Sequence, residues 1–270
     1  MASILRVWAV TTETWREVIF HNRWFQLSLI GIVVLVFGIQ SVTQLPLGSS
    51  SAKLIFDLGL GAVLMSLGVM LIISLVSLLN EDKWSGTLHV YLVRRLRRWE
   101  YLLGKLMGCW LSLVVAAGIA FAVLGLLVNQ EIAELTAQGL GVDAPGMGGW
   151  ILLYALMLQQ WLVLGTVVVF LTVLSRSFLL PVVLSSLLCL VSLFAGSVSD
   201  KSVADAGISQ NIFNALQAVL PRFDFGDVAN GLWYHGFPGL ADSLVMLGFG
   251  FAYGVLLFAA AAFVFGRKEL

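Results

Sequence analysis

Apolar residues occupy long uninterrupted blocks of this chain. Six stretches contain no Asp, Glu, Lys or Arg, and they are 25–44, 58–79, 106–128, 149–174, 177–199 and 243–266. At a rise of about 1.5 Å per residue, each is long enough as a helix to cross roughly 30 Å of hydrocarbon. Helices satisfy their backbone groups within the segment, and the alternation typical of barrel strands is absent. The pattern therefore predicts an all-α polytopic membrane protein with six transmembrane helices.

Composition and the placement of charge extend this prediction. The chain is 60% hydrophobic and 11% charged, whereas an average soluble domain is roughly 25% charged. Its mean hydropathy is +0.98, so we expect membrane lipid to cover most of its surface. Of the 15 Lys and Arg residues, only Lys53, Lys201 and Arg222 fall on one side of the predicted membrane. The positive-inside rule then predicts a multi-pass protein of the inner (plasma) membrane with both termini cytoplasmic.

The first 24 residues differ from the spans that follow, and we treat 1–24 and 25–270 as two parts. Apolar residues recur at helical spacing in 1–24, while charged residues take other directions: Ile4, Trp8, Trp15, Val18 and Ile19 against Arg6, Glu13 and Glu17. This pattern favours an amphipathic helix lying in the membrane interface, with Trp at headgroup depth. The alternative is a disordered cytoplasmic tail, in which several Trp residues would be unusual.

The connections between spans are unequal in length and charge. The second span is expected to start after Asp57 and end at Asn80, and the third to lead into an external loop of about twenty residues that holds Glu131 and Glu134. The largest external segment, 200–242, contains a short amphipathic pattern over 208–220 that Pro221 ends, which predicts a short external helix. This segment is a candidate contact for an external partner protein.

The only long cytoplasmic connection, 80–105, is densely charged. Its apolar residues recur at i, i+4, i+8 and i+11, and they are Leu88, Leu92, Leu96 and Trp99. Such a stripe, with arginines facing elsewhere, is typical of a short helix that docks into a groove on another protein. The alternative is that the arginines only set topology or contact anionic lipid headgroups.

Motifs for catalysis and cofactor binding are missing from the sequence. Gly104-Lys105 lacks the first glycine of a phosphate-binding loop, since Trp99 stands there, and Leu106 replaces the hydroxyl residue. The three His residues lie in separate segments without a Cys pair, which disfavours a metal site. We therefore expect no enzyme activity, metal or cofactor in this chain, and no nucleic-acid partner. The charge-free spans also disfavour a proton-coupled carrier or an independent channel.

Small and polar residues mark several faces of the predicted spans. Span five carries a stripe at i, i+4, i+7 and i+11, formed by Ser185, Cys189, Ser192 and Gly196, and the pairs Gly104/Gly108 and Gly250/Gly254 have the same character. Such stripes permit close helix approach, within a subunit or between subunits, and the alternative is that they line a pathway. Gln159 and Gln160 lie in mid-span and point in different directions, so we expect at least one of them to bond to a neighbouring helix.

A set of residues in the 80–105 loop has a characteristic spacing, and it comprises Glu81/Asp82, Gly86-Thr87-Leu88, Leu92, Arg98 and Leu103-Gly104-Lys105. In these residues and their spacing the loop resembles that of the permease subunits of ABC-2-type transporters. The amphipathic N-terminus looks like the family's elbow helix, and Leu220-Pro221-Arg222-Phe223 resembles a frequent feature before its last span. One departure is Arg95, which occupies the place of a usual proline, so the bend of the loop can differ.

The resemblance implies a division of labour. A separate ATPase subunit would bind ATP and Mg²⁺, and this chain, as a dimer, would form the pathway of an exporter. Residues 84–93 would be the coupling helix, with Glu81 or Asp82 pairing with a basic residue of the ATPase and Leu88 and Leu92 anchoring it. The implied docking set is Glu81, Asp82, Trp84, Gly86, Thr87, Leu88, Leu92, Arg94, Arg95 and Arg98. The alternative is a membrane component that transmits ATP-driven motion to an external partner without transporting a free solute.

Overall fold

The computed structural model describes residues 2–42, 51–85, 96–139, 146–175, 177–195 and 240–267. The chain divides into two compact units, Met1–Met147 and Gly148–Leu270. We describe each unit by itself. Within the described residues the secondary structure is helical throughout, which confirms the all-α prediction.

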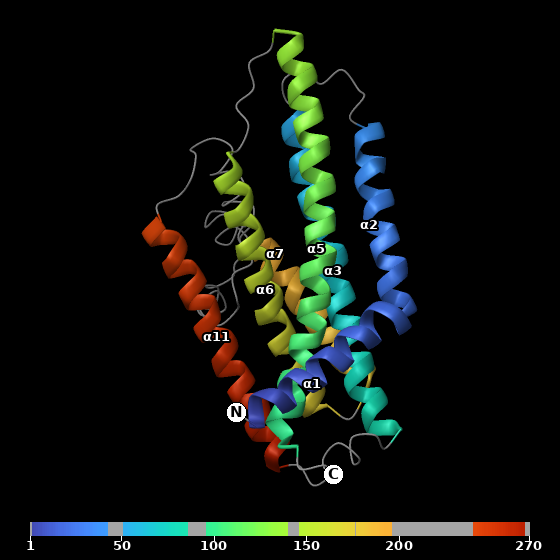
Figure 1. Ribbon diagram of the computed structural model, residues 1–270, viewed down its shortest axis with the longest axis vertical. Coiled ribbons are helices and arrows are strands. Elements are labelled where there is room, and N and C mark those ends of the chain that lie inside the picture. The colour runs from blue at the N-terminus through green and yellow to red at the C-terminus, as the bar shows by residue number, and fades with distance from the viewer. Residues whose placement is uncertain are drawn as a thin grey trace, which may run out of the picture. The chain divides into compact units, whose positions relative to one another are not determined.

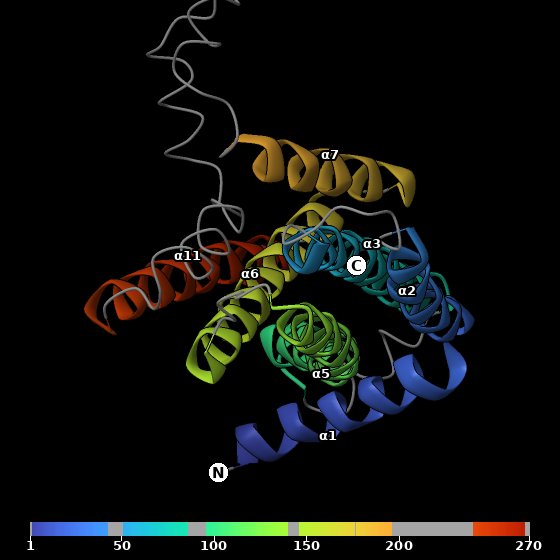
Figure 2. The same ribbon diagram turned by 90° about the horizontal axis from the view of Figure 1, so that it is seen from above.

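The first unit contains the N-terminal helix and a long helical hairpin (Figure 1). Its elements are α1 (Ala2–Arg16), the π-helical turn η1 (Glu17–His21), α2 (Arg23–Val42), α3 (Ser51–Trp84) and α5 (Arg98–Ala137). Helices α3 and α5 pack side by side along their length, with α2 against α3. Helix α1 crosses the hairpin obliquely near one end and packs on α5 (Figures 1 and 2). We call this end, where α3 finishes and α5 begins, the basic end of the unit.

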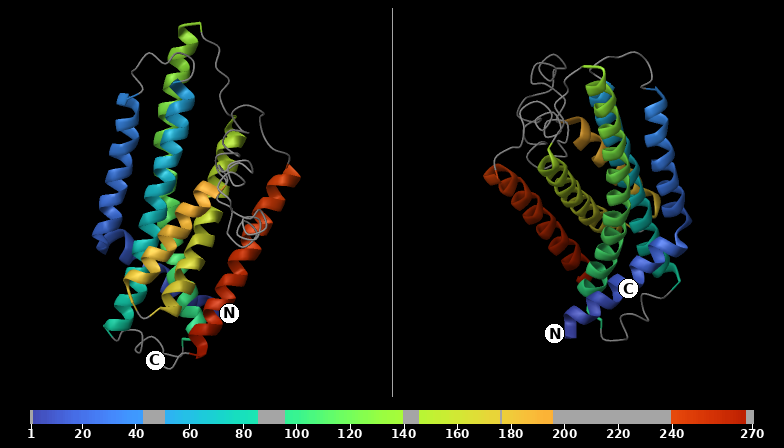
Figure 3. Two further views of the ribbon diagram at one scale, coloured as in Figure 1. Left: turned by 180° about the vertical axis from the view of Figure 1, so that it is seen from behind. Right: turned by 45° about the horizontal axis from the view of Figure 1, so that its top comes forward.

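The second unit consists of three described helices, which are also visible from behind in Figure 3. They are α6 (Met147–Leu174), α7 (Leu179–Ala195) and α11 (Leu240–Arg267). Helix α6 ends at Leu174 and α7 begins at Leu179. Between them, the Ser175 hydroxyl accepts a hydrogen bond from the Ser177 backbone N–H at 3.0 Å. The predicted external helix over 208–220 lies outside the described residues.

Among the described residues, four helices are long and apolar enough to cross a bilayer. They comprise Ser51–Trp84, Arg98–Ala137, Met147–Leu174 and Leu247–Arg267. A chain with several such helices is a helical membrane protein. Helix α2, with 20 residues, and α7, with 17, occupy the two remaining charge-free stretches. The count of six spans therefore stays a prediction.

The hairpin helices extend well beyond the boundaries expected from charge. Helix α3 begins at Ser51 rather than after Asp57 and continues past Asn80 to Trp84. Helix α5 runs through Glu131 and Glu134, which were expected in a loop, to Ala137. The expectation was wrong because an absence of charge marks only the part of a helix that lipid surrounds. A helix end in water can carry carboxylates, and here the Ser51 hydroxyl donates to Glu131 Oε1 at 2.6 Å.

Candidate functional site

Four polar side chains meet at the basic end of the first unit, and we call Glu17, Asp82, Tyr101 and Lys105 the charge cluster. The Lys105 Nζ atom lies 2.9 Å from Asp82 Oδ2 and 3.3 Å from Glu17 Oε2. The Lys105 side chain is 3% exposed and that of Asp82 12%, whereas that of Glu17 is 38% exposed. The buried ammonium group of Lys105 thus forms ion pairs with two carboxylates, that of Glu17 in η1 and that of Asp82 near the end of α3.

The hairpin itself brings the cluster together. Tyr101 and Lys105 are four residues apart on α5 and therefore share one helix face. The Tyr101 hydroxyl donates to Asp82 Oδ2 at 2.5 Å, which gives this carboxylate a second partner in addition to Lys105. A buried charge whose partner is removed is strongly destabilising. The cluster therefore fixes the last turn of α3 against the first turns of α5.

A second polar contact holds the start of α1. The Glu100 carboxylate is fully buried and accepts the Arg97 backbone N–H at 3.0 Å, which caps the N-terminus of α5. The Ser3 hydroxyl donates to Glu100 Oε1 at 2.5 Å, and Arg6 Nη2 lies 3.8 Å from the same oxygen. The first turn of α1 is thereby tied to the first turn of α5.

Between its two polar ends, α1 packs against two glycines of α5. A Cβ atom added at Gly104 would lie 2.6 Å from Val10 Cβ, and one at Gly108 would lie 2.6 Å from Thr14 Cβ. The latter would also lie 2.9 Å from the backbone oxygen of Thr11. Because these distances are too short for real Cβ atoms, both positions must be glycine for α1 to approach so closely. The predicted packing role of this pair is confirmed, with α1 as the partner.

The chain changes direction between α1 and α2 through η1. The Asn22 backbone N–H donates to the backbone oxygen of Glu17 at 3.1 Å, which is the i to i−5 hydrogen bond of a π turn. The Asn22 side chain then donates to Ser74 Oγ at 3.2 Å, while Gln26 Nε2 donates to the backbone oxygens of Ile19 and Phe20 at 3.1 and 3.3 Å. These side chains satisfy carbonyls that the helix break leaves exposed.

The structure separates the two acidic residues proposed for docking. Glu81 is exposed, whereas Asp82 is buried in the charge cluster. Trp84, the last residue of α3, is 78% exposed, and Arg98, the first residue of α5, is half-buried. The remaining members of the predicted docking set lie outside the described residues, and these are Gly86, Thr87, Leu88, Leu92, Arg94 and Arg95.

The predicted mid-span residues of the second unit fall into two groups. Gln159 Nε2 donates to the backbone oxygen of Leu247 on α11 at 2.8 Å, which confirms that one of the two adjacent amides bonds to a neighbouring helix. Ser185 is buried, and Gln160 and Cys189 are half-buried. The Ser192 side chain and Gly196 lie outside the described residues, so a pathway role for this stripe stays a prediction.

Sequence reasoning did not predict the charge cluster, although a signal for it was present. Lys105 and Asp82 each stand at the edge of a charge-free stretch, 106–128 and 58–79. If the two stretches form an antiparallel hairpin, these edges meet at one end. Within the described residues no group of three or more His, Cys, Asp or Glu side chains is placed to hold a metal ion.

No protein-family model matches this chain, and no curated protein does. The chain is a helical membrane protein whose most distinctive described feature is the charge cluster beside the docked N-terminal helix.

Proposed function

We propose that this chain is the membrane-spanning subunit of an ATP-driven transporter, similar to ABC-2-type permeases, and that a separate ATPase subunit docks on its 80–105 loop. One observation carries the proposal. The loop leaves α3 two residues after Asp82 and enters α5 three residues before Tyr101, and these residues share a hydrogen bond. Because the end of α3 and the start of α5 are bonded to each other, a force applied to the segment between them would move both helices together.

The exposed residues at the basic end support a docking role. Trp84 stands almost fully exposed beside the exposed Glu81. An exposed Trp is a frequent anchor at protein interfaces, and Glu81 is available to a basic residue of the partner. Asp82 has its partners inside the chain, so Glu81 is the acidic residue that we assign to docking.

The remaining parts of the proposal follow from the sequence. The distribution of Lys and Arg assigns the basic end to the cytoplasm, where ATP is available. ATP and Mg²⁺ would bind the partner subunit, and a second copy of this chain would complete an export pathway in the plasma membrane. The charge-free spans support this division, because they hold no Asp, Glu, His, Lys or Arg for energy coupling.

Affinity purification in mild detergent tests the proposal. The tagged full-length chain, expressed in its native cells, is expected to carry an ATP-binding subunit at a fixed stoichiometry. The substitutions Glu81→Arg and Leu88→Arg are expected to remove that subunit. Glu134→Arg is the matched control, because it reverses an exposed carboxylate at the opposite end of the hairpin.

Two outcomes would overturn the proposal. The first is a wild-type chain that purifies without any ATP-binding subunit. The second is a Leu88→Arg chain that retains the subunit in full and stimulates its ATP hydrolysis normally. Monodisperse elution of every variant from gel filtration is required, so that misfolding is not mistaken for lost docking.

A further inference from the structure

The charge cluster is asymmetric. Lys105 lies 2.9 Å from Asp82, which also accepts the Tyr101 hydroxyl, whereas Glu17 is 3.3 Å from the same ammonium group. The Glu17 side chain is also three times as exposed as that of Asp82, at 38% against 12%. The two carboxylates therefore depend on Lys105 to different degrees.

Release of Glu17 would leave no buried charge without a partner. Lys105 would keep Asp82, and Asp82 would keep Tyr101, so the buried part of the cluster stays paired. Glu17 already reaches water, and its carboxylate would complete its hydration there. Release of Asp82 would be far more costly, because this carboxylate is buried.

The backbone at Glu17 departs from regular α-helix. Glu17–His21 is a π turn, and Asn22 follows it in an extended conformation with φ −83° and ψ 99°. Before this turn, α1 is held by Gly104, Gly108 and Glu100. After it, α2 begins at Arg23. Movement at the turn would therefore change the angle of α2 without detaching α1.

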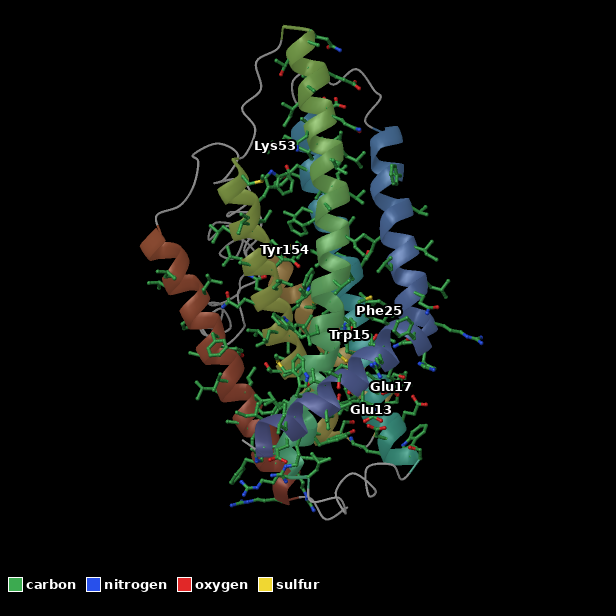
Figure 4. The ribbon with its side chains drawn as sticks, in the orientation of Figure 1. Glu13, Trp15, Glu17, Phe25, Lys53 and Tyr154 are labelled. Atoms are coloured by element: carbon green, nitrogen blue, oxygen red, sulfur yellow. The ribbon has the colours of Figure 1, made fainter. Side chains whose placement is uncertain are left out.

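We propose that Glu17 is a releasable latch, by which we mean that its ion pair with Lys105 breaks and reforms in the folded protein. When the pair breaks, the turn Glu17–His21 moves away from Lys105. Helix α1 stays docked on α5, and the contacts of Lys105 with Asp82 and of Asp82 with Tyr101 persist. Figure 4 shows Glu17 at this turn, with Glu13 one helical turn earlier. Opening must also uncover Val18, which is 1% exposed. The burial of Val18 keeps the closed form the main one. The latch does not depend on the function proposed above.

A native thiol reports on the latch. Cys109 lies four residues after Lys105, on the same face of α5, and is 2% exposed. The chain contains two Cys residues, so Cys189→Ser leaves Cys109 as the single thiol. Because Cys109 is buried on the helix face that carries Lys105, we expect opening of the turn to raise its labelling rate by N-ethylmaleimide in the purified full-length chain.

The test compares two matched substitutions in this background. Glu17→Gln keeps the size of the side chain and removes its charge, and it is expected to speed labelling about two- to fivefold, the effect of losing one partly exposed ion pair. Glu13→Gln makes the same change at an exposed residue of α1 and is expected to leave the rate unchanged. Equal labelling rates for Glu17→Gln and the parent chain would overturn the latch.

Hydrogen exchange measured by mass spectrometry distinguishes a latch from general loosening. In Glu17→Gln, faster exchange is expected at the backbone amides of 17–23, and exchange over 5–14 is expected to match the parent chain. Faster exchange along the whole of α1 would mean that the helix detaches entirely, and it would contradict a local latch.

Discussion

The two units of this protein fasten their helices with different polar chemistry. In the first unit, α1 is held on α5 by charged groups at both ends and by two glycines between them. In the second unit, the neutral amide of Gln159 on α6 donates to the backbone oxygen of Leu247 on α11 and lies against Gly250. Both contacts thus combine small residues with a hydrogen bond, but only one of them uses charge.

The position of each contact along its helix explains the difference. Lys105 stands just outside the charge-free stretch 106–128, while Gln159 lies in the middle of 149–174. An ionised group at the centre of a bilayer is costly, whereas a neutral amide can bond there at little cost. Charge can therefore fasten helices where the membrane ends, and amides and glycine fasten them inside it.

Removal of Lys105 is expected to have the largest effect. Lys105→Met leaves Asp82 and Glu17 without their shared cation, and the expected loss is about 3–5 kcal/mol of unfolding free energy. Thermal unfolding of the detergent-purified chain measures it. The double variant Lys105→Met/Asp82→Asn should recover most of that loss. A double variant no more stable than the single one would show that Lys105 acts through packing instead.

The glycine contact of the first unit comes next. Gly108→Ala places a methyl group against Thr14 and the backbone oxygen of Thr11, which should cost about 1–3 kcal/mol through overpacking. Gly125→Ala, on the same helix with open space around it, should be neutral or slightly stabilising. The difference between their melting temperatures is the measurement, and equal values would contradict close docking of α1.

The corresponding contact of the second unit should be somewhat less sensitive. At Gly250 an added methyl group meets the Gln159 amide, the movable end of a flexible side chain. At Gly254 the nearest atom to an added Cβ is Leu162 Cδ2, at an ordinary contact distance of 3.4 Å. We expect Gly250→Ala to cost about 1–2 kcal/mol and Gly254→Ala less. In a Gln159→Ala background the cost of Gly250→Ala should shrink, as unfolding of the four variants would show.

Loss of the Gln159 hydrogen bond alone should have the smallest effect on stability. Gln159→Leu removes the hydrogen bond to Leu247, and side-chain bonds between membrane helices contribute roughly 0.6 kcal/mol. A decrease in unfolding free energy much larger than that of Lys105→Met would reverse the comparison between the two units. Chemical denaturation in mixed micelles is sensitive enough to rank the two.

The sequence predicted the parts of the structure that depend on local pattern. Spacing alone identified Gly104 and Gly108 as a packing pair, and the amphipathic pattern of the N-terminus corresponds to α1. The partner of the glycines could not be predicted, because it depends on how α1 folds back across the hairpin. The same limitation applied to Asp82, a member of the predicted docking set, because its contacts with Lys105 and Tyr101 depend on how α5 packs against α3.

Helix ends were predicted less well than helix centres. Glu131 and Glu134 ended the apolar pattern, but the helix continues to Ala137 because these carboxylates do not interrupt its backbone bonds. The π turn at Glu17–His21 gave no signal in the sequence. It depends on side chains such as Gln26 that close on the backbone from the next helix.

The length of α5 has a mechanical consequence. With 40 residues, it is about 60 Å long, roughly twice the thickness of the hydrocarbon layer. About half of this helix therefore stands outside the bilayer core, and the rod is clamped at its basic end by α1 and Asp82. Rotating a rod of this length by about 10° moves its far end, at Ala137, by roughly 10 Å. A small tilt at the clamped end would thus become a large displacement on the opposite side of the membrane.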